Sequence, residues 1–258
     1  MKNNFFPFLG FLVIAFVLLF FLVAVAGVVY QLRISPPQQE FNFSEVLFAI
    51  KLSLFSSLAV AIFSVLLAIP SGYVLSRYEF WGKEVVEAVM LLPMVVSPIA
   101  LGAVLLMFFN TGAGKLLEKI FGPVVFSWRG IILAQLVIVL GLATTLIRTV
   151  FDYTPKEYEE IARTLGANGN QVFWRISLPL AKKGILAAAV LVWARALGEF
   201  GATVTLAGAT TFKTETLPVA IFLSLASADI YQTIILIILS LALAGAILFL
   251  LKFSLKRS

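Results

Sequence analysis

The sequence predicts an all-α integral membrane protein with six transmembrane helices. Of its 258 residues, 61% are hydrophobic and only 12% are charged, which leaves too little polar surface to cover a soluble globule. The hydrophobic residues also form long runs, each long enough to cross a hydrocarbon core of about 30 Å. No linker, low-complexity tract or obvious internal repeat divides the chain, so we predict a single membrane domain over residues 1–258.

Six apolar runs account for the predicted spans. Five of them are clear, and they cover residues 5–30, 52–76, 88–114, 130–150 and 230–251. The remaining run, residues 184–212, is the fifth span in chain order and is interrupted by Arg195 and Glu199. Ala24, Val25 and Ala26 in the first run resemble a signal-peptide cleavage site. We nevertheless expect an uncleaved anchor, because the run is far longer than the roughly 7 to 15 apolar residues of a signal peptide.

Lysine and arginine residues predict the orientation in the membrane. An even number of spans places both termini on one side, and that side would hold Lys2, Arg77, Lys83, Arg148, Lys156, Arg163, Arg175, Lys182, Lys183, Lys252, Lys256 and Arg257. The opposite side would hold only Arg33, Lys115, Lys119, Arg129 and Lys213. By the positive-inside rule, both termini and the polar segment 154–183 are predicted to lie in the cytoplasm of a cell-membrane protein.

Prolines and glycines indicate kinks in the second and third predicted spans, because they free backbone groups that neighbouring helices or water must satisfy. They are Pro70, Gly72, Pro93, Pro98 and Gly102. Membrane helices tolerate both residue types more often than soluble helices do, so tolerated kinks and a functional role both remain open.

Two opposite charges interrupt the fifth predicted span. If that span begins near Gly184, Arg195 lies roughly 16 Å and Glu199 roughly 22 Å along it, near the middle of the bilayer. A central arginine costs about 2.5 to 3.5 kcal/mol, so both charges should face protein or water, and their i, i+4 spacing lets them pair. The pair either holds helices together or lies beside a substrate route. We favour the structural role, since a paired arginine has little field left for an anion.

The polar segment 154–183 contains signals for a first short helix. Thr154, Pro155 and Glu157 fit an N-cap, a first-turn proline and an N3 carboxylate. Gly166 is the predicted end, because glycine adopts the left-handed C′ conformation at least cost.

A second short helix is predicted to follow the bend. Asn168 can cap it with Gln171 three residues later, and Pro179 is expected to limit its length. The first helix has an apolar stripe at helical spacing, formed by Tyr158, Ile161, Ala162 and Leu165. Because the chain offers almost no cytoplasmic domain to bury this stripe, we expect it to dock into a groove of a partner protein.

Composition excludes several functional classes. The chain has no cysteine and no histidine, which removes disulfides, thiol nucleophiles, the commonest metal ligand and the usual acid–base group at neutral pH. We therefore predict neither catalytic residues nor a metal site. The net charge of +6 is not accompanied by a nucleic-acid recognition motif, and membrane topology accounts for it better.

Six positions of the polar segment have a spacing that resembles the cytoplasmic EAA signature of ABC importer permeases. They are Glu160, Ala162, Gly166, Ile176, Leu178 and Pro179. Ile161 stands where the signature usually has a second alanine, which leaves the spacing intact. The resemblance implies a coupling segment that docks on an ATPase through Glu160, Ile161, Ala162, Leu165, Gly166, Ile176, Leu178 and Pro179. Glu160 would contact the ATPase, Ala162 would permit close approach, and Gly166 would permit the bend.

Two downstream runs add to the resemblance. Residues 193–202, WARALGEFGA, are similar to the fifth-span motif of permeases for tetrahedral oxyanions, namely molybdate, tungstate and sulfate. Residues 213–218 with 220–223 are more similar to molybdate and tungstate permeases than to sulfate permeases. The implied fold is that of a type I ABC importer permease, with its coupling-helix segment between spans 4 and 5.

The resemblance also implies partners. A type I importer contains two permease copies, here a homodimer in membrane lipid, two cytoplasmic ATPase subunits and an extracytoplasmic oxyanion-binding protein. The chain has no GxxxxGK[ST] sequence to hold phosphates, so ATP and Mg²⁺ are expected on the partner ATPase, and this chain is expected to bind no cofactor and to be no enzyme.

The transport route is less defined by the sequence. Ser97, Thr203 and Thr205 are candidate lining residues, although ordinary hydrogen bonding between helices explains any single one of them as well. A sulfate or thiosulfate permease is the main alternative. A secondary transporter is a more distant one, because we see neither an unpaired intramembrane carboxylate nor repeat symmetry. A channel would leave the capped cytoplasmic segment unexplained.

Overall fold

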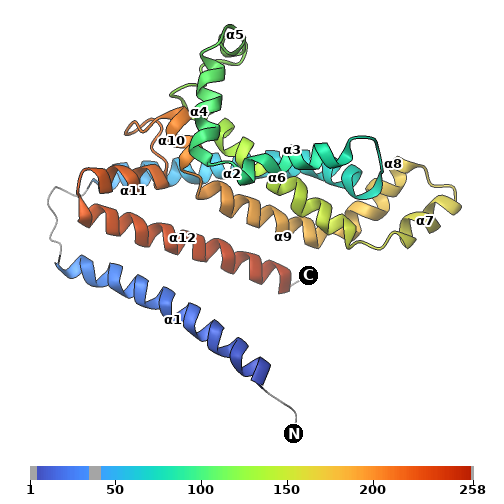
Figure 1. Ribbon diagram of the computed structural model, residues 1–258, viewed down its shortest axis with the longest axis horizontal. Helices are drawn as coiled ribbons and strands as arrows, with labels where there is room; N and C mark the ends of the chain where they lie inside the picture. Colours follow the sequence, from blue (N-terminus) through green and yellow to red (C-terminus); the bar gives the residue numbers. More distant parts are fainter. Residues whose placement is uncertain (1–4, 35–41, 257–258) are drawn as a thin grey trace.

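The computed structural model describes residues 5–34 and 42–256, and every regular element within those ranges is a helix. Four long helices match predicted spans: α1 (Phe5–Ile34), α2 (Phe43–Arg77), α6 (Trp128–Asp152) and α12 (Ile230–Lys256). They run along the long axis of the molecule (Figure 1). The second begins earlier than predicted, because Asn42 caps its N-terminus by accepting a hydrogen bond from Glu45 N at 3.3 Å.

The third predicted span, residues 88–114, is not one continuous helix. It consists of α3 (Lys83–Val95) and α4 (Pro98–Phe109), which are bent by 106° at the break between them. Pro98 is the first residue of α4, and the residue before a proline avoids the α region, as the ψ of 132° at Ser97 shows. A kink was predicted here, but it separates the span into two helices. Five described helices are long and apolar enough to cross a membrane, or six if the bent pair is one span.

The fifth predicted span also has different bounds. A continuous helical segment covers Gly169–Leu197, formed by α8 (Gly169–Val172), the π-helical turn η1 (Phe173–Ser177) and α9 (Leu178–Leu197). The chain leaves the helix at Gly198, and a short helix, α10 (Gly201–Ala207), follows. The prediction of one span over 184–212 is therefore wrong at both ends, because apolar composition alone did not reveal the break after Leu197.

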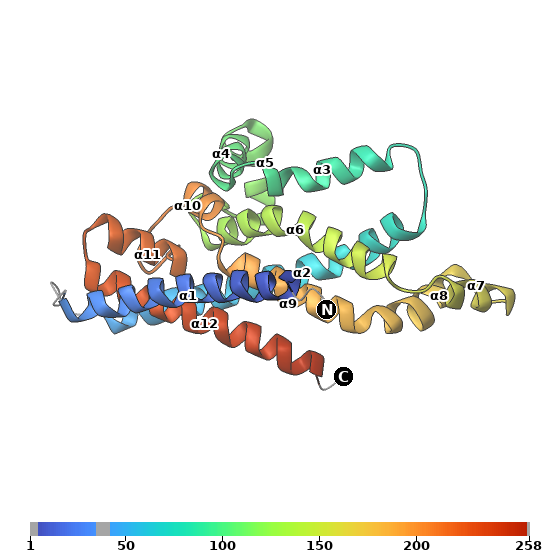
Figure 2. The ribbon, with the colours of Figure 1, turned by 60° about the horizontal axis from the view of Figure 1, so that its bottom comes forward.

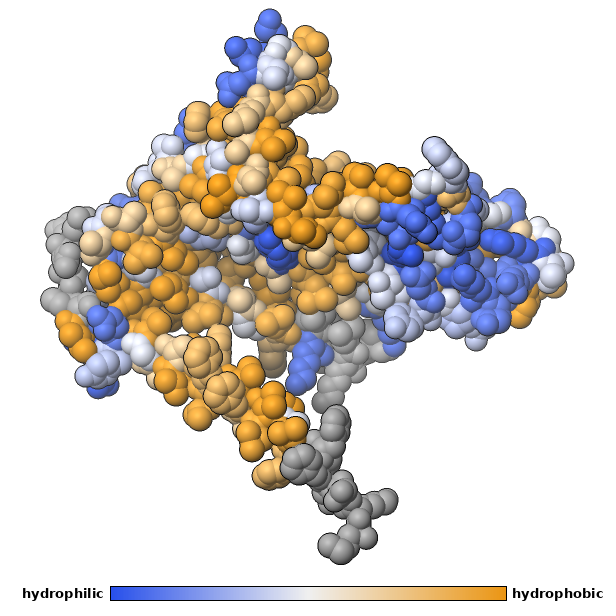
Figure 3. All heavy atoms as spheres, viewed as in Figure 1, coloured by the Kyte–Doolittle hydropathy of each residue, from blue (hydrophilic) through white to orange (hydrophobic). Residues whose placement is uncertain are grey.

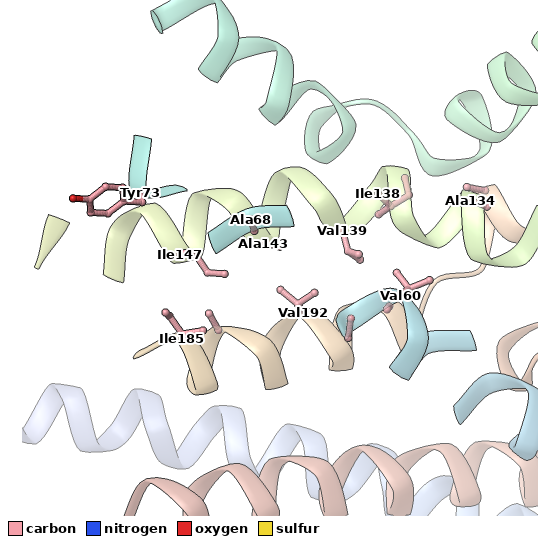
Figure 4. Packing of buried hydrophobic residues seen from close by; sticks show 14 of the residues in the cluster. Val60, Ala68, Tyr73, Ala134, Ile138, Val139, Ala143, Ile147, Ile185 and Val192 are labelled. Atoms are coloured by element: carbon pink, nitrogen blue, oxygen red, sulfur yellow. The ribbon is translucent and has the colours of Figure 1, made fainter. Parts of the chain in front are cut away.

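The core is formed by α2, α6 and α9, with side chains such as Val60, Val139, Ile147 and Val192 packed between them (Figure 4). Small residues bring the backbones together, as expected in a membrane, where close packing replaces the hydrophobic effect. A Cβ on Gly72 would lie only 2.9 Å from Arg148 N, so α2 and α6 are in near-backbone contact at that point.

The two breaks in the chain pack against each other. At Gly102 of α4, a Cβ would lie 2.9 Å from Ala202 Cα and 2.8 Å from Thr205 Cβ of α10. At Gly201, a Cβ would lie 3.0 Å from Pro98 Cβ. Helix α3 runs alongside α6, and α4 turns away from that direction in both views (Figure 2). The bent third span and the interrupted fifth span therefore meet through glycine and alanine.

The remaining elements lie at the ends and the periphery: α5 (Gly112–Phe121), α7 (Glu157–Thr164) and α11 (Leu217–Ala226). Helix α1 is exposed along almost its whole described surface and packs weakly on α12. The N-terminal end of α1 and the C-terminal end of α12 point toward the end of the molecule that carries α7 and α8 (Figure 1). Hydrophilic residues gather at that end, and hydrophobic residues cover most of the middle and left of the view (Figure 3). Lys2 and Arg257, which entered the charge comparison, lie outside the described residues.

Candidate functional site

The first helix of the polar segment begins two residues later than predicted. Lys156, not Thr154, is the N-cap of α7. The Thr154 side chain instead donates a hydrogen bond to Val150 O at 2.9 Å, at the end of α6, so it is not available to cap α7. Three carboxylates, Glu157, Glu159 and Glu160, occupy the first turn of α7, where the helix dipole favours negative charge.

The bend after α7 is built as the sequence predicts. Gly166 has a φ of +90°, and its N–H donates to Arg163 O at 3.0 Å. Ala167 N donates to Ala162 O at 3.0 Å, which completes a Schellman motif. A Cβ at Gly166 would meet no atom within 4 Å, so the need for glycine comes from the backbone conformation and not from crowding.

The predicted cap of the second helix is confirmed. Asn168 Oδ1 accepts a hydrogen bond from Gln171 N at 2.9 Å, and Gln171 Oε1 accepts one from Asn168 N at 3.0 Å, which is a reciprocal capping box. Pro179, however, does not end this helix. The turn η1 places a wider hydrogen bond, from Leu178 N to Phe173 O, just before the proline. Since a proline ring clashes with the carbonyl four residues earlier in an α-helix, the π turn lets the helix continue into α9.

Most of the predicted coupling residues line one groove. The groove has a volume of about 420 Å³ and is lined by Tyr158, Ile161, Ala162, Leu165, Arg175, Ile176, Pro179 and Leu180. Ile161 is 56% exposed and Leu165 is 83% exposed, which is unusual for apolar side chains at the polar end of the molecule. Gly166 lies at the adjoining hollow, Glu160 is exposed on α7 outside the groove, and Leu178 packs against the core.

A buried carboxylate that the sequence interpretation missed lies on the side of α7 that contacts α2. Glu159 is 3% exposed, and its Oε1 is 2.8 Å from Arg77 Nε at the end of α2. Tyr73 OH donates to Glu159 Oε2 at 3.2 Å, and Ser177 Oγ donates to Oε1 at 2.9 Å. The available signal was the position of Glu159 outside the apolar stripe, but its partner on α2 is remote in sequence.

Arg195 and Glu199 form the predicted ion pair at the break between α9 and α10. Arg195 Nη1 donates to Glu199 Oε2 at 2.7 Å, and Glu199 Oε1 accepts from Ala202 N at 3.1 Å in the first turn of α10. The Glu199 side chain is 2% exposed, whereas that of Arg195 is 40% exposed. The carboxylate therefore holds two elements together, while part of the guanidinium faces an open surface.

The three candidate lining residues have different surroundings. Ser97 is exposed at the break between α3 and α4, and its side chain makes no capping hydrogen bond. Thr205 lies against Gly102 in the contact between α4 and α10, and its hydroxyl donates to Gly201 O at 2.8 Å. Thr203 is fully buried, so it does not face an open surface in this arrangement, contrary to the expectation that it lines a route.

A third buried carboxylate lies in the loop before α11. Glu215 is fully buried; its Oε2 accepts a hydrogen bond from Phe212 N at 3.4 Å, and its Oε1 has no hydrogen-bond partner among the described residues. Burial, followed by the neighbouring carboxyl of Glu45, raises the pKa of Glu215 from 4.5 to about 7. A proton on Glu215 would remove both the cost of burying its charge and the repulsion from Glu45.

This carboxyl predicts a pH dependence of stability. Between about pH 4.5 and about pH 7 the folded state holds a proton on Glu215 that the unfolded state releases, so the free energy of unfolding falls as the pH rises through that range. In detergent, the Glu215→Gln variant should have a higher Tm than the wild type at about pH 8 and a smaller decline in Tm between about pH 5 and about pH 8. Glu84→Gln, a change at an exposed carboxylate, is the control and should keep the wild-type decline. An equal decline in the Glu215 variant would contradict the assignment.

Residues 65–257 match the model of a family described as binding-protein-dependent transport system inner membrane component. The molybdenum transport system permease protein ModB of Haemophilus influenzae is 38% identical over 177 residues, which cover 67% of this chain and 77% of that protein. A probable molybdenum ABC transporter permease protein of Haloferax volcanii is 33% identical over 234 residues, 90% of this chain and 84% of that protein. The sulfate transport system permease protein CysW of Synechococcus elongatus is 35% identical over 66% of this chain and 60% of that protein.

Solved structures show the same fold at low sequence identity. A bacterial ABC transporter involved in the import of the acidic polysaccharide alginate matches with a TM-score of 0.76 at 18% identity, over 99% of this chain and 98% of that chain. The MetNI methionine ABC transporter in inward-facing conformations matches with a TM-score of 0.65 at 17% identity, over 82% of this chain and 95% of that chain. The arrangement of helices is therefore one that ABC transporters use.

Proposed function

This chain belongs to the family of binding-protein-dependent transport system inner membrane components, and on that basis we propose how its two sites divide the work of an importer. The chain is a multi-pass transmembrane permease of a molybdate-type ABC importer, and ATP hydrolysis belongs to a separate subunit. The groove between α7 and η1 couples it to that ATPase, and the α4–α10 contact with Arg195 lies on the route of the anion.

The exposed groove carries the coupling part of this proposal. Ile161 and Leu165 project apolar surface at the polar end of the molecule, where water would otherwise cover them. A groove of about 420 Å³ beside a short amphipathic helix fits docking against the surface of a cytoplasmic ATPase. Glu160, exposed on α7, supplies a charge at the rim of the same contact.

Orientation and oligomeric state follow from the same surfaces. If the groove faces the cytoplasm, the ends of α1 and α12 that point the same way place both termini there. The partly exposed guanidinium of Arg195 lies at a break between apolar helices, and an arginine facing lipid would be costly. A second copy of the chain, with a water-filled route between the copies, removes that cost. We therefore propose a homodimer in which one membrane domain per copy borders the route.

The cargo is proposed to be molybdate or the chemically similar tungstate, delivered by an extracytoplasmic binding protein. The support is the identity to molybdenum permeases over most of the chain. Sulfate is the second candidate, because a sulfate permease is 35% identical over a shorter region. Arg195 would lend positive potential to a dianion, while Glu199 holds the arginine in place.

The decisive experiment reconstitutes the chain with its ATPase and binding protein in liposomes. ATP hydrolysis that depends on the binding protein should be stimulated by molybdate and tungstate and more weakly by sulfate. Uphill transport of an oxyanion by the chain without an ATPase would contradict the proposal. Stimulation by sulfate alone would identify sulfate, the second candidate, as the cargo.

Docking at the groove makes a separate prediction. Leu165→Ser removes an apolar side chain whose burial is worth about 1.5 to 3 kcal/mol, so the affinity for the ATPase should fall by roughly 10- to 100-fold. The control is Leu116→Ser on α5, which changes another exposed leucine, outside the groove. Co-purification and titration of the ATPase against the reconstituted chain measure the difference. Equal affinities of the two variants would show that the groove does not bind the ATPase.

A further inference from the structure

A continuous chain of polar contacts connects the docking helix α7 to the half-span α3. We propose that this polar relay, defined as Glu159, Arg77, Ser76, Asp152, Arg148 and Glu87, positions α3 according to the state of the docked ATPase. The inference rests on the proposed function of the groove. None of these residues lines that groove or belongs to the EAA-like spacing.

The first link of the polar relay attaches α7 to α2. Glu159 and Arg77 are each 4% exposed at their side chains, and Oε1 and Nε are 2.8 Å apart. Arg77 Nη2 also donates to Thr154 O at 2.9 Å, so the same guanidinium fixes the loop that leads into α7. A buried charge that loses its partner costs several kcal/mol. A movement of α7 should therefore carry Arg77 and the end of α2 with it.

The second link passes from α2 to α6. Arg77 Nη1 donates to Ser76 Oγ at 3.1 Å, and Ser76 Oγ donates to Asp152 Oδ1 at 2.6 Å. Asp152 is the last residue of α6 and also receives Arg148, whose Nε is 3.6 Å from Oδ2. The end of α6 is therefore held between α2 and its own preceding turn.

The third link reaches α3. Arg148 Nη1 is 2.7 Å from Glu87 Oε2, which lies in the second turn of α3. Helix α3 packs chiefly on α6, and this is the ion pair that joins α3 to another long helix in the described part of the chain. Glu87 Oε1 and Arg148 Nε have no hydrogen-bond partner there, so the α3 end of the polar relay is less fully satisfied than the Glu159 end.

The position of α3 has consequences for the proposed route. Its C-terminal end is the 106° break, where Ser97 is exposed and where α4 begins its contact with α10. A helix of 13 residues is roughly 20 Å long, so a small rotation about the Glu87 end displaces the break. The polar relay is thus placed to carry a movement of α7 to the α4–α10 contact. It does so through α2, α6 and α3, which its ion pairs and hydrogen bonds join in that order.

Glu87→Gln and Glu159→Gln, alone and together, test the proposal in the liposome complex. Each single change should lower the ratio of stimulated to basal ATP hydrolysis by roughly tenfold, which is within the usual range of coupling between sites. Because the two residues act through one connection, the double variant should lose no more than the worse single variant. The control is Glu84→Gln, an exposed carboxylate on α3 that should keep the wild-type ratio.

A second measurement separates coupling from mere stability. Since the chain contains no cysteine, Ser97→Cys gives each copy of the chain one thiol, at the α3–α4 break. In otherwise wild-type complexes, ATP with vanadate should change the alkylation rate of this thiol, and the change should disappear with Glu87→Gln or Glu159→Gln but persist with Glu84→Gln. If Glu87 and Glu159 had only a structural role, their variants would form less complex. The complex that did form would still show the change in alkylation rate.

The outcomes distinguish this inference from the proposed function. If the wild-type chain binds no ATPase, the docking proposal fails and the polar relay with it. If it does bind, but both single variants respond as the wild type does, or their losses multiply in the double variant, only the polar relay is refuted. Should Glu159→Gln fail to assemble, Glu87→Gln and Arg148→Lys decide, because Glu87 and Arg148 are partly exposed, at 24% and 31% of their side chains.

Discussion

Replacing Arg195 with methionine should abolish transport and reduce the amount of assembled complex by at least tenfold. The change removes the cation that pairs at 2.7 Å with Glu199, whose side chain is 2% exposed. A buried carboxylate without its partner costs about 3 to 5 kcal/mol, which is a large part of the stability of a typical domain. Membrane insertion, complex assembly and transport should be measured together, since the single change affects all of them.

The double variant Arg195→Met with Glu199→Gln separates the two roles of the pair. A glutamine at position 199 can still accept the hydrogen bond from Ala202 N, so the start of α10 keeps its cap and no unpaired charge remains. We expect assembly to recover and transport to stay absent, because the route has lost its positive potential. Recovery of transport together with assembly would assign the pair a structural role only, as the sequence had favoured.

Replacing Gly166 with valine should leave the chain in the membrane but uncouple the ATPase. Gly166 has a φ of +90°, and a β-branched residue is a strong outlier at positive φ. The strain of about 1 to 2 kcal/mol would lower the population of the bent segment by a factor of roughly 5 to 30. The measurement is the binding-protein-dependent stimulation of ATP hydrolysis, compared with the basal rate of the same complex.

Two further variants make the Gly166 test specific to backbone conformation. Gly166→Asn should lose less stimulation than Gly166→Val, because asparagine tolerates left-handed conformations. Gly169→Val is the matched control, since a Cβ at Gly169 also meets nothing within 4 Å, but its φ is not in the positive range. Equal losses for Gly166→Val and Gly169→Val would mean that side-chain volume, and not the bend, is responsible.

The sequence predicted those parts of the fold that depend on local signals. Long apolar runs located α1, α2, α6 and α12, and the turn chemistry of Gly166, Asn168 and Gln171 predicted the shape of the docking segment. The same runs did not reveal that the third and fifth spans are interrupted. Hydrophobicity reports whether a segment can be buried, whereas the breaks depend on Pro98 and on the close approach that Gly102 and Gly201 permit.

The candidate site was predicted to the extent that it is local. The apolar stripe on α7 became one wall of the groove, and the Arg195–Glu199 pair formed with the expected i, i+4 spacing. The buried role of Glu159 was not predictable in the same way, because Arg77 is 82 positions away and only tertiary packing brings the two together. Pro179 was wrongly predicted to end the helix, because no local sequence signal indicates the π turn that precedes it.

That π turn determines which side of α9 faces the rest of the bundle. The π turn Phe173–Ser177 holds one residue more than an α-helical turn, so deleting one residue there to restore an α-helical turn would rotate α9 by about 100° relative to α8. Because Gly169–Leu197 is one continuous helical segment, that rotation would turn the guanidinium of Arg195, near its C-terminal end, to a different side of the bundle. The side of the bundle that the Arg195 charge faces is therefore fixed by the one residue that the π turn adds.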